Sequence, residues 1–339
     1  MQGSGTFTVE SIVSSTIPPG GKLLVIINGA YGDRIEKIAA CHGIETVALR
    51  CDENELPDLH AIDEALAADA SITMAAVVHC ETTSGIINPI REIGEICGRN
   101  GRQYFVDSMS AFGAVPLDFA ACQIDYLVSS ANKCIEGVPG FGFAICRRAA
   151  LESTAGWART LSLDLLAQWQ GLENNGQFRF TPPTHVILAF RQALDELEAE
   201  GGVAGRAARY RQNYETLVAG MREMGFEEYV PRELQGHIIT SFRYPEDARF
   251  DFTEFYRRLS DRGFVIYPGK VTGADCFRIG NIGRLFPHDV QALLHAIRDT
   301  LDRHGMSDGA HVRRVVTRGD KSTPTQDPRL VIGPATVVS

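Results

Sequence analysis

The first half of the chain alternates between continuous apolar runs and segments whose apolar residues recur with helical spacing. The apolar runs predict strands at 22–27, 45–49, 72–79, 103–107, 125–129 and 141–146. The segments between them predict helices at 7–15, 33–42, 59–68 and 89–100. Apolar strands that alternate with helices are typical of a mostly parallel sheet covered by helices on both faces. We therefore expect an α/β fold with its chemistry beyond the carboxyl ends of the strands.

The second half has a different pattern, with longer amphipathic helices and fewer apolar runs. Helices are predicted at 186–200, 210–221, 252–261 and 290–301, and strands at 237–242, 264–267 and 276–279. This mixture predicts a smaller α+β domain. We expect a large domain at 1–201, a small C-terminal domain at 202–304 and a disordered polar tail at 305–339.

Length and charge narrow the class of protein. A chain of 339 residues favours about two domains. The formal net charge of −9 and the lack of a basic tract argue against nucleic acid or an anionic membrane surface as a partner. No apolar run approaches the ~20 residues of a membrane helix, and the first residues lack the pattern of a signal peptide. We expect a cytoplasmic enzyme.

The cysteines and histidines favour neither a disulfide framework nor a metal site. The eight cysteines are scattered, without a C-x-x-C pair, and several lie in apolar segments. Such a distribution is typical of reduced, buried thiols. The nine histidines show no zinc spacing, so no metal is expected.

Two polar motifs are candidates for holding an anion and a cation. Gly3-Ser4-Gly5-Thr6 precedes a predicted helix, where free backbone N–H groups could hold a phosphate, although a simple helix cap has the same composition. Asp107 ends the predicted strand 103–107. Its carboxylate could pair with a cationic heterocycle in a dry crevice, or cap the following turn.

Two cationic residues stand in unusual surroundings. Lys133 follows the predicted strand 125–129 in a small, glycine-rich stretch, which makes it a candidate Schiff-base lysine, although most lysines are solvated surface groups. Arg278 lies inside the apolar strand 276–279. A buried arginine needs an anion, which would be either a structural carboxylate or a substrate.

Taken together, seven ordered motifs resemble the class V aminotransferases, which are pyridoxal-phosphate enzymes of fold type I. The resemblance extends from residue 2 to about residue 301. The motifs are MQGSGTF (1–7), NGAYGDR (28–34), HCETTSG (79–85), VDSMS (106–110), SSANKC (129–134), RFTPPTH (179–185) and FRIGNIG (277–283).

The resemblance implies a role for each candidate residue. Lys133 would bind the cofactor covalently and shuttle the substrate proton, and Asp107 would keep the pyridine nitrogen protonated. Tyr31 would stack on the cofactor ring, and Thr82 would bind its hydroxyl. The phosphate would be held by Ser4, Gly5, Thr6 and Asn132, with Thr181 reaching it from the neighbouring subunit. Arg278 would bind the substrate anion.

The resemblance also implies substrates, a partner and a missing segment. Within the family the motifs are most similar to members that move the amino group of 2-aminoethylphosphonate to pyruvate in phosphonate degradation, so we expect these small-molecule substrates and an active homodimer. Related members that use serine or alanine with glyoxylate or pyruvate remain an alternative, as does an inactive truncated homologue. A cysteine desulfurase is disfavoured, because Cys276 lies in a predicted strand. Family members have several dozen residues before the Gly-Ser-Gly-Thr motif, so we expect the N-terminal part of the large domain to be incomplete.

Overall fold

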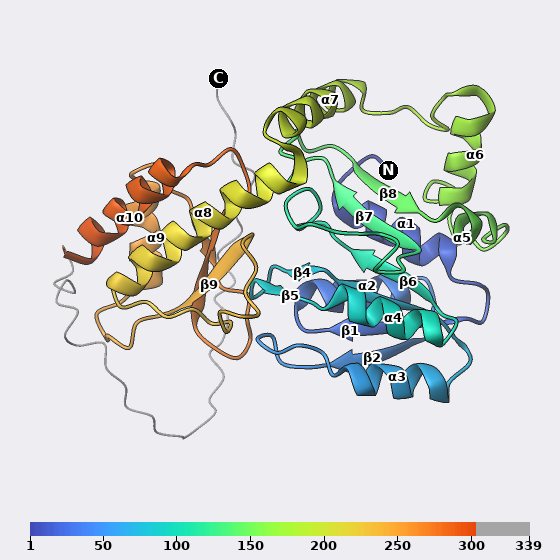
Figure 1. Ribbon diagram of the computed structural model, residues 1–339, viewed down its shortest axis with the longest axis horizontal. Helices are drawn as coiled ribbons and strands as arrows, with labels where there is room; N and C mark the ends of the chain where they lie inside the picture. The colour runs from blue at the N-terminus through green and yellow to red at the C-terminus, as the bar shows by residue number, and fades with distance from the viewer. Residues whose placement is uncertain (303–339) are drawn as a thin grey trace.

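A six-stranded, mostly parallel sheet forms the framework of the first half of the protein (Figure 1). The computed structural model describes residues 1–302, and the tail predicted at 305–339 lies outside them. The strand order is β2-β1-β3-β6-β7-β8, and β8 alone runs antiparallel to its neighbour. The strands are β1 (Lys22–Ile27), β2 (Thr46–Arg50), β3 (Ile72–Val78), β6 (Gln103–Asp107), β7 (Tyr126–Ser130) and β8 (Gly142–Cys146).

Helices cover both faces of this sheet because its central strands are apolar on both sides. Along β1, Leu23, Val25 and Ile27 pack with α1, α2, α5 and α6, whereas Leu24 and Ile26 pack with α3 and α4. These helices are α1 (Gly5–Thr16), α2 (Ala30–Cys41), α3 (Leu59–Ala68), α4 (Ile90–Arg99), α5 (Arg148–Glu152) and α6 (Leu165–Asn175). The three-layer α/β architecture confirms the predicted fold class.

The second half builds a smaller antiparallel sheet with its own core. Its strand order is β10-β11-β9, from β10 (Tyr267–Pro268), β11 (Cys276–Gly280) and β9 (Ile239–Arg243). The sheet packs with α8 (Gly202–Glu223), α9 (Phe252–Ser260) and α10 (Pro287–Asp302) around buried Phe242, Phe255 and Phe277. Helix α7 (Thr184–Ala199) leads into α8 (Figure 1). The domain boundary at 201/202 stays a prediction.

Four local elements differ from those the sequence pattern predicts. The strand expected at 264–267 is reduced to β10, because Gly263 turns the chain at φ +85° and the Phe264 N–H still bonds the Leu259 carbonyl at the end of α9. Helix α5 has five residues and α6 buries only Leu165 and Leu166, so neither gives a clear apolar period. Helix α1 begins two residues before the expected start, which brings Gly5 and Thr6 into its first turn.

Candidate active site

The carboxyl ends of four parallel strands meet at one edge of the large sheet. Strands β3, β6 and β7 are neighbours, and the residues that follow them include His79, Ser108 and Lys133. Strand β1 has β2 on one side and β3 on the other, so the direction of winding reverses between β1 and β3. Ligands of doubly wound sheets bind in the crevice at such a reversal.

Asp107, the last residue of β6, is a buried carboxylate with one free oxygen. It is 5% exposed, and its Oδ1 accepts a hydrogen bond from the Met109 N–H at 2.9 Å. Its other oxygen accepts none from residues 1–302. Burial raises the pKa of Asp107 to about 6, although the positive charges of Arg34 and Lys133 act in the opposite direction. The geometry therefore suits a cationic partner for this carboxylate.

His79 lies directly against Asp107 and was not among the predicted site residues. Its backbone N–H donates to the Asp107 carbonyl at 2.8 Å, and its Nδ1 lies 3.0 Å from the Ser108 Oγ. Burial lowers the pKa of His79 to about 4, so the imidazole is neutral at neutral pH. The sequence signal was its position immediately after the apolar run of β3.

Glu81, in the short strand β4 (Cys80–Glu81), fixes the start of α2 and was also missed. Its Oε2 accepts hydrogen bonds from the backbone N–H groups of Tyr31 at 3.1 Å and Gly32 at 3.3 Å. Its Oε1 accepts from the Thr83 N–H at 3.0 Å and the Thr83 hydroxyl at 2.7 Å. Burial raises the pKa of Glu81 despite these bonds. The carboxylate thereby determines where Tyr31 lies.

Tyr31 is the common neighbour of several cations. The Arg34 Cζ lies 4.7 Å from the centre of its ring, and the Lys270 Nζ lies 5.0 Å from it. Burial alone would raise the pKa of the Tyr31 phenol. A hydrogen bond with the Thr82 side chain and the positive charges of Lys270 and Lys133 have the opposite effect, and together they lower this pKa below its usual value. Tyr31 and Thr82 are thus brought together, while the stacking and hydroxyl-binding roles stay predictions.

The start of α1 offers unsatisfied donors beside Asp107. Ser4 precedes the helix without capping it through its side chain, and the N–H groups of Gly5 and Thr6 have no acceptor within residues 1–302. A Cβ on Gly5 would collide with the side chain of Met109, so this helix start packs against the turn after β6. Arg34 donates a hydrogen bond to the Thr6 hydroxyl at 3.3 Å and adds a positive charge near this helix start. Arg34 is part of the NGAYGDR motif but was not among the predicted site residues.

Lys133 lies in a tight turn after β7. The Glu136 N–H donates to the Lys133 carbonyl at 2.8 Å, and the Gly137 N–H donates to the Ala131 carbonyl at 2.8 Å. Lys133 is half-buried, and its Nζ makes no hydrogen bond with the described part of the chain. Asn132 beside it is exposed. The free amine is available to a ligand in the crevice.

A buried ion-pair network attaches this turn to α8. The Glu136 carboxylate accepts hydrogen bonds from Arg209 at 2.8 Å and from the Tyr210 hydroxyl at 2.7 Å. Arg206, which is almost fully buried, donates to the Cys134 carbonyl and to Glu200. The lysine turn is therefore held by the second half of the protein as well as by β7.

Arg278 reaches the same crevice from β11. Its Nε donates to the Pro268 carbonyl at 3.0 Å, and its Nη1 donates to the Thr82 carbonyl at 2.7 Å. It is 6% exposed, and within residues 1–302 no carboxylate lies within 4 Å of it. Burial lowers its pKa. A buried guanidinium without an acidic partner is suited to an anionic ligand.

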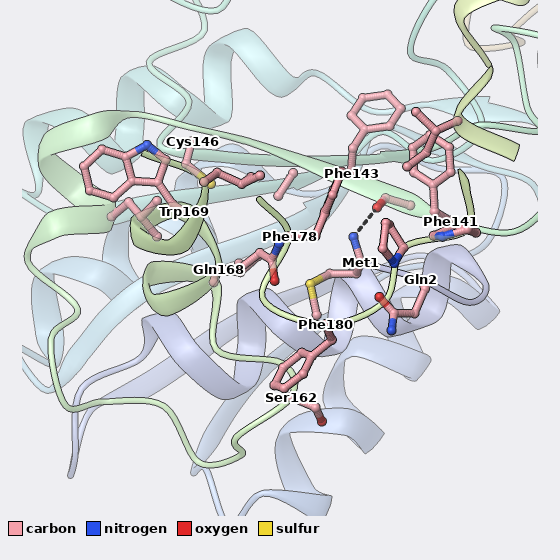
Figure 2. Close-up of a pocket in the computed structure, with 18 of the residues that line it drawn as sticks. Met1, Gln2, Phe141, Phe143, Cys146, Ser162, Gln168, Trp169, Phe178 and Phe180 are labelled. Carbon is pink, nitrogen blue, oxygen red and sulfur yellow. Dashed lines mark hydrogen bonds between the residues drawn. The ribbon is translucent and has the colours of Figure 1, made fainter. Parts of the chain in front are cut away.

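Thr181 does not join the other predicted site residues. It is exposed, in the loop between α6 and α7. Next to this loop is an apolar cavity of about 560 Å³, which is lined by Phe178 and Phe180 of the loop together with Met1, Phe141 and Phe143 (Figure 2). A contribution of Thr181 to the crevice would have to come from another copy of the chain.

Within residues 1–302, no group of three or more His, Cys, Asp or Glu side chains is arranged to hold a metal ion. None of the helices described is both long and apolar enough to cross a membrane.

Comparisons with known proteins agree with this geometry. The description "Aminotransferase class-V" belongs to the family profile that matches residues 3–272. The 2-aminoethylphosphonate–pyruvate transaminases of Salmonella heidelberg (strain SL476) and Salmonella typhimurium are each 54% identical over 302 residues, which is 89% of this chain and 82% of the relative.

Solved structures share the fold. Pyridoxamine–pyruvate aminotransferase from Mesorhizobium loti superposes with a TM-score of 0.82 at 24% identity, over 92% of this chain and 82% of the other. Alanine–glyoxylate aminotransferase from Nostoc sp. superposes with a TM-score of 0.81 at 24% identity, over 88% of this chain and 80% of the other. With the family profile and the sequence relatives, the strand-end geometry leads to one conclusion: this chain belongs to the class V aminotransferase family.

Proposed function

We propose that this protein transfers the amino group of 2-aminoethylphosphonate to pyruvate, giving phosphonoacetaldehyde and L-alanine, with pyridoxal 5'-phosphate as cofactor. The observation that carries the reaction type is the pair Asp107 and Lys133, a buried carboxylate and an unbonded amine after neighbouring strands. The 54% identity to transaminases of that name supports these substrates.

The residues present fit the cofactor. The free oxygen of Asp107 suits a protonated pyridine nitrogen, which would stabilise the ionised form of a carboxylate that burial otherwise disfavours. The unsatisfied N–H groups of Gly5 and Thr6 suit the phosphate, and we expect Ser4 and Asn132 to help hold it. When bound, the cofactor supplies an aldehyde for the amine and a ring that accepts electrons from the substrate carbon.

Three residues of the site then have separate roles in the proposed reaction. Lys133 would supply the amine that holds the cofactor, and it would move a proton to and from the reacting carbon. Asp107 keeps a proton on the ring nitrogen. Arg278 binds the acidic group of either substrate and orients the amino end toward Lys133.

We further propose that the active form is a homodimer, in which Thr181 of each chain approaches the phosphate held by the other. Exposed apolar side chains lie in the loop that contains Thr181 and in the segments before and after it, with Leu161 74%, Phe178 47% and Leu188 71% exposed. A face of this kind is typical of a subunit interface. The eight free cysteines support a reducing, cytoplasmic location.

An amino-donor screen tests the proposal. Purified protein loaded with pyridoxal 5'-phosphate is given pyruvate and one donor at a time, and the keto acid or aldehyde product is measured. We expect 2-aminoethylphosphonate to exceed L-serine and glycine by at least about tenfold in kcat/KM. Turnover of L-serine or L-alanine with glyoxylate, without turnover of the phosphonate, would assign the chain to the related aminotransferases instead.

A further inference from the structure

A lysine that no sequence motif singled out lies beside the substrate-binding arginine. Lys270 belongs to the loop between β10 and β11, and Arg278 lies on β11 itself. The Lys270 Nζ is 3.4 Å from the Tyr31 hydroxyl. Arg278 donates to the carbonyl of Pro268, two residues before Lys270, and the electrostatic influence of Tyr31 reaches Arg278 as well.

Neither cation is neutralised by the protein. Within residues 1–302, neither Lys270 nor Arg278 has a carboxylate within 4 Å, whereas Lys22 pairs with both Glu45 and Asp69. Glu53 anchors the loop: its carboxylate accepts a hydrogen bond from the Thr272 N–H at 2.7 Å, and it makes no ion pair with Lys270. Two cations that lie on one loop and the strand after it, without an acidic partner among the described residues, favour an anion with more than one charge.

The carboxylate of one substrate and the phosphonate of the other differ in charge and in the number of oxygens. A carboxylate carries one charge and two oxygens, which a single guanidinium satisfies with two parallel hydrogen bonds. A phosphonate carries up to two charges on three oxygens, so one guanidinium leaves an oxygen and part of the charge unmatched. Lysine acts as a compact point charge that can bind the remaining oxygen.

We propose that Lys270 and Arg278 bind the phosphonate group together, and that Arg278 alone suffices for the carboxylate of pyruvate or L-alanine. Lys270 is then the residue that sets the preference for phosphonates. This inference rests on the proposed function for the identity of the substrate, and it adds the residue that distinguishes the two acids.

The test measures binding without turnover. The dissociation constants of 2-hydroxyethylphosphonate and L-lactate, which lack the amino group, are determined by titration calorimetry on the cofactor-loaded protein. Lys270→Ala should weaken the phosphonate about tenfold or more and the carboxylate less than about twofold. Lys270→Arg, which keeps the charge, should restore phosphonate binding to within about threefold of the original protein. Lys37→Ala, at an exposed lysine of α2, is the matched control and should change neither value.

Two results would overturn the inference: equal weakening of both anions by Lys270→Ala, or no phosphonate binding by the original protein. Failure of the proposed function looks different. In that case the protein fails to transaminate 2-aminoethylphosphonate, yet phosphonate binding still depends on Lys270.

Discussion

The two sides of the crevice are built in different ways. On the cofactor side, Asp107 ends β6, and His79 and Glu81 come shortly after its neighbour β3. All three are buried; the Asp107 and Glu81 carboxylates accept hydrogen bonds from nearby backbone N–H groups, and the His79 Nδ1 lies 3.0 Å from the Ser108 Oγ. On the substrate side, Arg278 and Lys270 come from the small sheet and a loop, and Arg278 bonds only to two backbone carbonyls. From this difference we expect the cofactor side to control the rate of the chemistry and the substrate side to control the affinity for substrate.

The largest effect is expected on the cofactor side. Lys133→Ala removes the only group proposed both to attach the cofactor and to move the proton, so turnover should fall below detection. The visible absorption band of the lysine-bound cofactor should disappear with it. Absorption spectra and L-alanine formation measure this, with Lys37→Ala as the control. A variant that kept both the band and turnover would show that Lys133 is not the attachment site.

Asp107→Asn should lower the maximal rate by about 10³-fold, because the ring nitrogen loses its anionic partner. Asparagine can still accept the hydrogen bond from Met109, so the fold should survive, as circular dichroism would check. Saturation by either substrate should change little. Turnover within a few-fold of the original protein would refute the role of Asp107. The cofactor side would then not control the rate more than the substrate side does.

The pKa of Asp107 makes a separate prediction for the cofactor-free protein. Its value of about 6, against 3.8 for an unburied group, means that the folded state favours the protonated form. The contribution of protonated Asp107 to the free energy of unfolding is fully present below pH 3.8 and is lost as the pH rises through about 6. The loss is about 3 kcal/mol. Urea unfolding should show Asp107→Asn gaining stability relative to the original protein as the pH rises from about 4 to 7. A pH-independent difference would mean that the carboxylate is not buried.

On the substrate side, Arg278→Lys keeps the charge but loses the two-pronged geometry and the bonds to Pro268 and Thr82. Saturation by both substrates should worsen by roughly 1–3 kcal/mol. The cofactor band should not change. Half-reactions with each substrate measure this separately. Unchanged saturation for both would make Arg278 a structural residue.

The sequence predicted the parts of the site that depend on local pattern. Asp107 and Lys133 were recognisable because each follows an apolar strand, and Arg278 because it is a charge within one. The alternation of strands and helices likewise predicted the parallel sheet, since each strand carries its own signal.

The remaining residues depend on which strand ends become neighbours. Glu81 and His79 acquire their roles only because β3 lies beside β1 and β6. Lys270 meets Tyr31 across 239 positions of sequence, a contact that no periodicity encodes. Thr181 is proposed to act from a second copy of the chain, which the pattern of one chain does not place.

Single-turnover kinetics of the half-reaction with 2-aminoethylphosphonate test the division of roles most directly. The original protein, Asp107→Asn and Arg278→Lys are each loaded with cofactor and mixed with increasing substrate. We expect Asp107→Asn to lower the rate constant at saturation with an almost unchanged half-saturating concentration, and Arg278→Lys to raise the half-saturating concentration with an almost unchanged rate constant. A fall of the saturating rate in Arg278→Lys as large as in Asp107→Asn, with an unchanged half-saturating concentration, would contradict this division of roles.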